Sequence, residues 1–221
     1  KGAIALLDTE YSYWMSGNNV VNVQHAGRVH VLNRYYARTE LPRPESYRED
    51  VACADVARTS GGMTSTDSQL FRDLATVAES GWDFSARWFA WDEIDEVDQG
   101  ANAGLHCSAA TRVIPVDLNA ILYRMERNLA RAHMTLGTVT HKQQQQQRHS
   151  SDAANVAGRG SGGGESEARC LNRERSEYYS AAALARREAM NSLLWDDSVG
   201  RWRDGWLTEE ANGIDDDDDG D

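Results

Sequence analysis

The chain has 221 residues, of which 40% are hydrophobic, and it carries a formal net charge of −12. This length and apolar content suffice for one domain with a substantial core, and no apolar run approaches the roughly 20 residues of a membrane-spanning helix. The acidic balance argues against nucleic acid as a partner, because phosphate binding requires a basic surface.

The first elements follow from hydrophobic spacing. Apolar residues that recur every three or four positions predict an amphipathic helix over residues 3–15. Residues 20–33 are rich in β-branched side chains around a glycine-containing turn, which predicts a small β-hairpin. Residues 47–58 predict a second helix, with Val51 and Val56 as its few apolar points.

Two prolines stiffen the segment just before this second helix. Pro42 and Pro44 force the residues that precede them toward extended conformations. Arg43 and Glu45 would then lie on a stiff, non-helical loop, where side chains can be aimed at a ligand. Arg43 would offer a planar fork of donors to sugar hydroxyls, and Glu45 an acceptor. From the residues alone, a solvent-exposed loop with an incidental ion pair is the alternative.

A third helix is predicted to follow, with Thr66 or Asp67 as its N-cap and Gly81 as its end. Its expected buried residues are Leu70, Phe71, Leu74, Val77 and Ala78.

The segment E-S-G-W-D-F-S-A-R-W-F, residues 79–89, places one carboxylate, Asp83, among aromatic side chains. A carboxyl group enclosed by Trp82, Phe84 and Trp88 would lose the solvation of its charged form, which favours the protonated acid. A protonated carboxyl group is what a general acid requires, and Gly81 would let the backbone approach a ligand closely. A helix end with a core tryptophan and an exposed aspartate is the alternative interpretation.

Residues 92–110 are acidic, then small and polar, and predict a loop before the clearest helix of the chain, which begins at Pro115. Asp117 and Asn119 lie in its first turn, either as capping groups or as groups that line a pocket. The apolar face of this helix is expected to comprise Leu118, Ile121, Leu122, Met125 and Leu129.

The composition then becomes low in complexity. A glutamine run at 143–147 and a glycine-rich stretch at 158–164 mark residues 138–174 as a disordered insertion between two helices. The helix after it is predicted over 176–195. Its expected buried residues are Tyr179, Ala182, Ala183, Met190, Leu193 and Leu194. Residues 211–221 predict a solvated acidic tail.

Several kinds of chemistry find no support in the sequence. The three cysteines are far apart and predict no disulfide framework, and His106 and Cys107 lack the second ligand pair that a zinc site needs. The glycine-rich stretch lacks the G-K-[ST] of a phosphate-binding loop. We therefore expect no metal and no cofactor. The first residues resemble the middle of a longer chain, so we assign no compartment.

Three segments, in this order, resemble the trehalases of glycoside hydrolase family 37. They are L-P-R-P-E-S-Y-R-E-D-V at 41–51, E-S-G-W-D-F-S-A-R-W-F at 79–89 and I-P-V-D-L-N-A-I-L-Y-R-M-E-R-N-L at 114–129. The segment W-D-D-S-V-G-R-W, residues 195–202, is similar to the family's transition from a helix to a hairpin. The resemblance extends from about Ala3 to Leu207.

The resemblance implies a mainly α fold that is part of an (α/α)6 barrel with small β-hairpins. The predicted helices account for about half of twelve, so residues 1–210 are expected to form a partial catalytic domain, a fragment. The resemblance also implies an activity: hydrolysis of α,α-trehalose to two glucoses with inversion. In that chemistry one carboxylic acid protonates the glycosidic oxygen, and a second carboxylate, about 6.5–9.5 Å away, activates water.

By position in the matching motifs, the resemblance implies that Asp83 is the general acid. It implies substrate contacts for Arg43, Pro44, Glu45, Gly81 and Trp82. The family's catalytic base, a glutamate far downstream, has no matching motif in this chain. A degenerate, non-catalytic carbohydrate-binding relative and another (α/α)6 glycosidase are the alternatives.

Overall fold

The computed structural model describes residues 2–59, 66–83, 85–90, 104–151 and 162–207, with the backbone alone within 139–166. Its described part is mainly α, as predicted, with three small antiparallel strand pairs. The helices are α1 (Ala3–Trp14), α2 (Tyr47–Thr59), α3 (Asp67–Ser80), α4 (Val116–Ser151) and α5 (Gly162–Leu193). The strands are β1 (Val20–His25), β2 (Arg28–Asn33), β3 (Val113–Ile114), β4 (Trp195–Asp196), β5 (Arg201–Trp202) and β6 (Gly205–Trp206).

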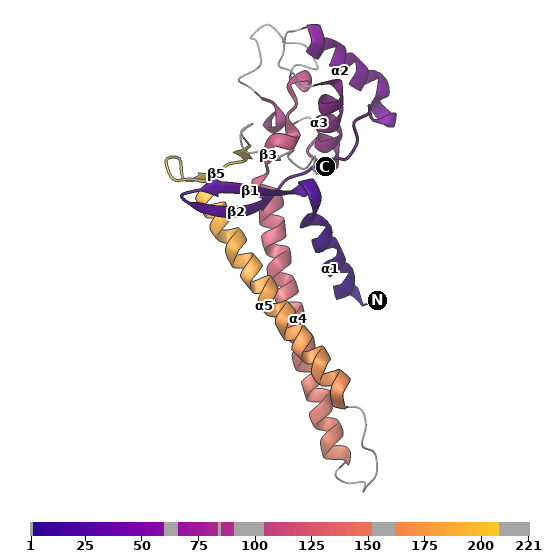
Figure 1. The fold of residues 1–221 in the computed structure, drawn as a ribbon, viewed down its shortest axis with the longest axis vertical. Helices are drawn as coiled ribbons and strands as arrows, with labels where there is room; N and C mark the ends of the chain where they lie inside the picture. The colour runs from indigo at the N-terminus through magenta and orange to yellow at the C-terminus, as the bar shows by residue number, and fades with distance from the viewer. Residues whose placement is uncertain (1, 60–65, 84, 91–103, 152–161, 208–221) are drawn as a thin grey trace, which may run out of the picture.

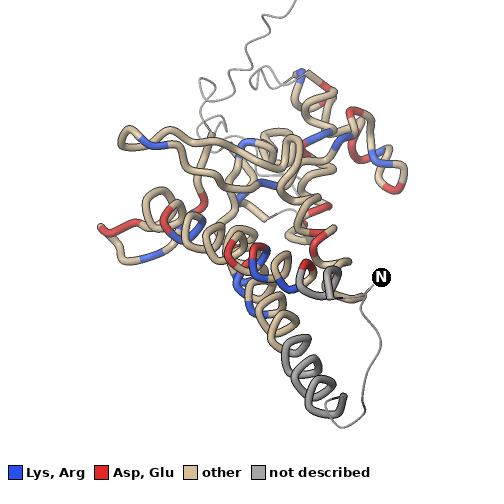
Figure 2. Tube along the Cα trace, turned by 60° about the horizontal axis from the view of Figure 1, so that its bottom comes forward, with Lys and Arg blue, Asp and Glu red and all other residues tan. Residues whose placement is uncertain are grey.

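Helices α4 and α5 form a long antiparallel hairpin that organises the molecule (Figure 1). Helix α1 lies alongside α4, and the β1–β2 ribbon lies across one end of the hairpin. Helices α2 and α3 pack together beyond that end, near the start of α4. Acidic and basic residues are interspersed along the described chain (Figure 2). None of the helices described is long and apolar enough to span a membrane.

The predicted hairpin at residues 20–33 is confirmed. Strands β1 and β2 are antiparallel, and His25 pairs with Arg28 across a two-residue turn. The turn residues, Ala26 with φ 48° and Gly27 with φ 74°, both lie in the left-handed region, as a type I′ turn requires. This turn type matches the right-handed twist of the two strands, which offsets the strain at a residue other than glycine.

Two helix faces differ from the prediction. Val56 on α2 is 41% exposed, and the buried positions of that helix are Asp50 and Ala54. Ile121 on α4 is 60% exposed. Sparse apolar residues define the buried face of a helix poorly, and on α2 that face carries Asp50, which pairs with Arg43.

The long hairpin extends into the segment that composition marked as an insertion. Helix α4 continues to Ser151, and α5 begins at Gly162 rather than at residue 176. Asn172 lies within that segment, yet its Oδ1 contacts His133 Nδ1 on α4 at 3.0 Å. The prediction of disorder is therefore wrong for the end nearest residue 174, where the helices pack together. Residues 152–161, and the acidic tail at 211–221, lie outside the described residues.

A buried polar cluster joins α1, β2, α4 and α5. Glu126 Oε1 accepts hydrogen bonds from Arg186 Nε at 2.8 Å and from the Tyr11 hydroxyl at 3.0 Å. Arg186 Nη1 donates to Asn33 Oδ1 at 2.9 Å and to Asn119 Oδ1 at 2.8 Å. Burial raises the pKa of Glu126 above its ordinary value, although Arg186 opposes this effect. The cluster holds four elements in one arrangement through directional bonds.

Candidate active site

The segment 79–83 begins where α3 ends. Thr66 caps the start of this helix by accepting a hydrogen bond from Gln69 N at 3.2 Å, and Gly81 ends it with a left-handed φ of 71°. Both predictions for α3 are confirmed. A Cβ at position 81 would meet no atom within 4 Å, so the backbone conformation, rather than lack of space, favours glycine here. Trp82 and Asp83 follow directly from this turn.

The aromatic enclosure predicted around Asp83 is not formed by the described residues. Asp83 is exposed, and Trp82 is 52% exposed. Trp88 is fully buried in the core beside Val77, and its indole Nε1 donates to the Trp82 carbonyl at 3.0 Å. The buried indole therefore holds the backbone before Asp83 and does not cover the carboxyl group. Phe84 lies outside the described residues.

The loop that carries Arg43, Pro44 and Glu45 leads directly into α2. Arg43 has the extended backbone that Pro44 demands, with φ −62° and ψ 131°. Residues Pro44–Ser46 then form a single 3-10 turn, so the expectation of a wholly non-helical loop is wrong. Pro44 and Glu45 are exposed. Proline suits the first position of a helical turn because it has no N–H to leave unpaired.

Arg43 is held by a carboxylate that sequence reasoning missed. Asp50 Oδ2 accepts from the backbone N of Arg43 at 2.9 Å and from its Nε at 3.0 Å, while Oδ1 accepts from Nη2 at 2.7 Å. The side chains of Arg43 and Asp50 are 11% and 2% exposed. The planar fork is thus engaged within the protein, which corrects the expectation that it points whole toward a ligand. The signal in the sequence was an aspartate seven residues after the arginine, in the first turn of α2, where its side chain can reach back to the preceding loop.

The charges that affect Arg43 come from both segments. The pKa of Arg43 is raised, first by its hydrogen bonds to Asp50 against the opposing effect of burial, and further by the charges of Asp50, Glu45 and Asp83. Helices α2 and α3 are in contact, so the loop before α2 and the turn after α3 belong to the same part of the molecule, beyond the end of the long hairpin.

Arg87 anchors the other side of the segment 79–89. Its Nε and Nη2 donate to Asp204 at 2.8 and 2.6 Å, and Nη1 and Nη2 donate to Asp117 at 3.1 Å each. Asp204 Oδ1 also accepts from Val116 N, at the start of α4, at 2.9 Å. The sequence left Asp117 and Asn119 as either capping groups or groups that line a pocket. Asp117 accepts a hydrogen bond from Leu118 N at 3.0 Å in the first turn of α4. Asn119 belongs to the buried polar cluster and donates to the Asn33 carbonyl.

The chain matches the trehalase family over residues 1–214. The chain belongs to the trehalase family.

Its relatives include insect and bacterial trehalases. The chain is 32% identical over 200 residues to the trehalase of Apis mellifera, which covers 90% of this chain and 25% of that protein. It is 32% identical over 208 residues to the periplasmic trehalase of Salmonella paratyphi B, covering 90% and 27%. It is 30% identical over 201 residues to the trehalase of Pimpla hypochondriaca, covering 91% and 27%. The chain therefore spans about a quarter of the length of the curated relatives it matches.

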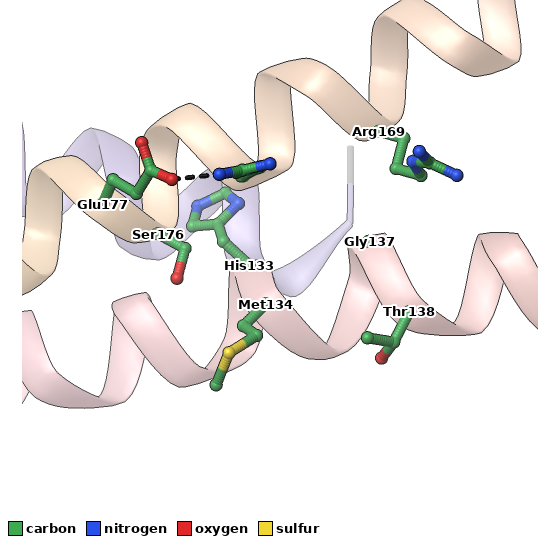
Figure 3. A pocket seen from close by; sticks show the side chains of 8 residues that line it. His133, Met134, Gly137, Thr138, Arg169, Ser176 and Glu177 are labelled. Carbon is green, nitrogen blue, oxygen red and sulfur yellow. Dashed lines mark hydrogen bonds and ion pairs between the residues drawn. The ribbon is translucent and has the colours of Figure 1, made fainter.

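A separate groove lies along the helical hairpin of this trehalase-family chain (Figure 3). It has a volume of about 540 Å³, and none of the six predicted site residues lines it. Its lining comprises His133, Met134, Gly137, Thr138, Arg169, Arg173, Ser176 and Glu177. The groove therefore does not belong to the candidate active site. Among the described residues, no group of three or more His, Cys, Asp or Glu side chains could hold a metal ion.

Proposed function

We propose that this chain supplies the general acid of a trehalase, with Asp83 as the proton donor to the glycosidic oxygen of α,α-trehalose. The observation that carries the proposal is the match to the trehalase family over residues 1–214, with Arg43, Glu45 and Asp83 on segments that adjoin two helices in contact, α2 and α3. A disaccharide bound between the loop before α2 and the end of α3 would touch both segments. The reaction class is hydrolysis to two glucoses with inversion of configuration.

Each residue of the site has a part in this proposal. Glu45, exposed in the turn before α2, accepts hydrogen bonds from sugar hydroxyls. Arg43, fixed by Asp50, orients the sugar through its guanidinium. The exposed indole of Trp82 offers an apolar face to the sugar ring, while Gly81 keeps the backbone open to close approach.

Asp83 is exposed in this chain, so in our proposal it becomes a proton donor only when the sugar is bound. Bound sugar would cover the carboxyl group and remove water from it, which favours the uncharged, proton-donating form. The acid then protonates the leaving oxygen as the glycosidic bond breaks. A second carboxylate, which we do not assign to any residue of this chain, would activate water from the opposite side.

The test is Asp83→Asn in a trehalase of the relatives' full length that carries this sequence. The amide keeps the shape and removes the transferable proton, so kcat should fall by about 10²–10⁴-fold while calorimetry still detects trehalose binding. Glu79→Gln, an exposed carboxylate in the same segment, is the matched control and should retain normal turnover.

Retention of more than about a tenth of kcat by Asp83→Asn would contradict the proposal, given the size of general acid catalysis. Binding of trehalose by the unaltered protein without release of glucose would favour the non-catalytic carbohydrate-binding alternative.

A further inference from the structure

Arg87 ties together three segments that are far apart in the sequence. Its guanidinium forms bidentate hydrogen bonds with Asp117, in the first turn of α4, and with Asp204, between β5 and β6. The side chain is 18% exposed. Two such contacts fix both the position and the plane of a guanidinium, because each pairs two fixed donors with two acceptors.

The same guanidinium lies over two indole rings. Its Cζ lies 4.9 Å from the centre of the Trp88 ring and 5.5 Å from the centre of the Trp82 ring. Trp88 is fully buried and also donates its Nε1 hydrogen to the Trp82 carbonyl. Trp82 is thus held at its ring by Arg87 and at its backbone by Trp88, although half of its surface is open to solvent.

We propose that Arg87 is a positioning residue that sets the orientation of Trp82 and, through the shared backbone, of Asp83. The role of Asp83 as general acid rests on the proposed function, whereas the hold on Trp82 does not. An exposed indole at a helix end would otherwise sample several side-chain rotamers. The cation fixed against one face of the ring selects one of them, since a cation over an indole is attracted to the electron-rich face.

A purely structural role would leave this arrangement unexplained. The start of α4 is already tied to the turn at Asp204 without Arg87, because Asp204 Oδ1 accepts from Val116 N at 2.9 Å. The pairing of Val113 with Trp206 holds the same two segments together. What Arg87 adds to these contacts is the hold on the segment 82–88, which carries the proposed acid.

The first test needs no activity. The chain is labelled with 5-fluorotryptophan, and the Trp82 resonance is assigned from its loss in Trp82→Phe. Arg87→Met, which keeps an apolar stem and removes the cation, should shift the Trp82 resonance. Arg58→Met, an exposed arginine on α2, is the control and should leave Trp82 unchanged.

An unchanged Trp82 resonance in Arg87→Met would overturn the proposal. If that variant does not fold, Arg87→Lys takes its place, and an unchanged Trp82 resonance would again overturn the proposal. Lysine keeps the charge but cannot form both bidentate contacts that fix the cation in position.

The second test separates positioning from stability in a full-length trehalase that carries this sequence. Arg87→Lys should lower kcat by about 10²-fold, the scale of a misplaced catalytic group, with KM nearly unchanged. A lower thermal midpoint with unchanged kcat would show a structural role alone and overturn the proposal. Activity retained by Asp83→Asn would refute the proposed function instead, and the fluorine experiment would still decide the hold on Trp82.

Discussion

Arg43 and Asp50 form an enclosed ion pair at the candidate active site, so Asp50 should matter to stability as well as to sugar binding. Asp50→Ala leaves the guanidinium of Arg43 without its partner in a site where the arginine is only 11% exposed. Breaking a buried ion pair costs about 3–5 kcal/mol, and we expect the lower end because Arg43 retains some contact with solvent. Urea unfolding of the purified chain measures the effect.

Asp55→Ala provides the matched control on the same helix. Asp55 pairs with Arg58 at 2.6 Å, but both side chains are more than half exposed, and such pairs contribute about 0–1 kcal/mol. Equal losses of stability in the two aspartate variants would show that the enclosure of the Arg43 pair has no energetic consequence.

Asp73 on α3 should give the chain a distinctive pH dependence. Burial raises the pKa of Asp73 to about 6, although hydrogen bonds from Thr111 and Gln69 act to lower it. The folded state therefore binds the proton more tightly than the unfolded state, whose pKa is 3.8. The contribution to stability is fully present below pH 3.8 and is lost as the pH rises through about 6, on the order of 3 kcal/mol.

Asp73→Asn removes this titration and keeps an oxygen that can accept from Thr111 N. The free energy of unfolding of the unaltered chain, relative to this variant, should fall between pH 4 and pH 6 and be level on either side. A difference that does not change over this range would contradict the raised pKa.

At this scale, the motif residues were accessible from the sequence and their partners were not. Gly81 favours the left-handed conformation that ends a helix, and Pro44 favours an extended residue before it. The structure confirms both predictions. The exposure of Asp83 and the pairing of Arg43 with Asp50 depend on which side chains the fold brings into contact. Aromatic neighbours in the sequence do not determine that choice, as the outward position of Trp82 shows.

Among the elements, α1, β2, α4 and α5 depend on the cluster around Glu126 and Arg186. Both side chains are at most 2% exposed, and Glu126 Oε2 has no hydrogen-bond partner among the described residues. Arg186→Met should destabilise the chain by about 3–5 kcal/mol, because it leaves a buried carboxylate without its cation. Chemical denaturation measures this loss, with the exposed Arg187→Met as the control.

A second substitution separates charge from packing in this cluster. Adding Glu126→Gln to Arg186→Met removes the stranded charge and should recover much of the lost stability. If the double variant is no more stable than Arg186→Met, the loss comes from packing alone.

The far part of the helical hairpin should be dispensable for stability. Deleting residues 139–168 and joining Thr138 to Arg169 with a short Gly-Ser linker keeps the contact between His133 and Asn172. The cost of closing a loop depends only logarithmically on its length, so the thermal midpoint should fall by no more than about 2–4 °C. A much larger fall would show that the deleted segment packs against the rest of the chain.

Elements with strong periodicity were predictable, and those with biased composition were not. Helices α1 and α3 and the β1–β2 hairpin follow from spacing, caps and turn residues. The beginning of α5 at Gly162 could not be predicted in this way, because glycine-rich and glutamine-rich segments have no hydrophobic periodicity. The position of Asn119 in a buried polar cluster could not be predicted either, because the cluster forms only where β2 and α5 contact α4.

For the whole molecule, family membership and the mainly α fold agree, and the chain spans about a quarter of the length of the relatives it matches. Closure of an (α/α)6 barrel stays a prediction. The two segments proposed to form the site come from the α2–α3 end of the molecule, beyond the long hairpin (Figure 1). For this end of the molecule we propose that Asp83 donates a proton to the oxygen of the leaving sugar.

The most direct measurement compares two substrates of Asp83→Asn in a full-length trehalase that carries this sequence. Trehalose must lose a glucose whose oxygen needs a proton, whereas glucosyl fluoride loses fluoride, which needs little protonation. We predict that kcat for trehalose falls by about 10²–10⁴-fold while kcat for glucosyl fluoride falls far less. Equal losses for both substrates would contradict the assignment of Asp83 as the general acid.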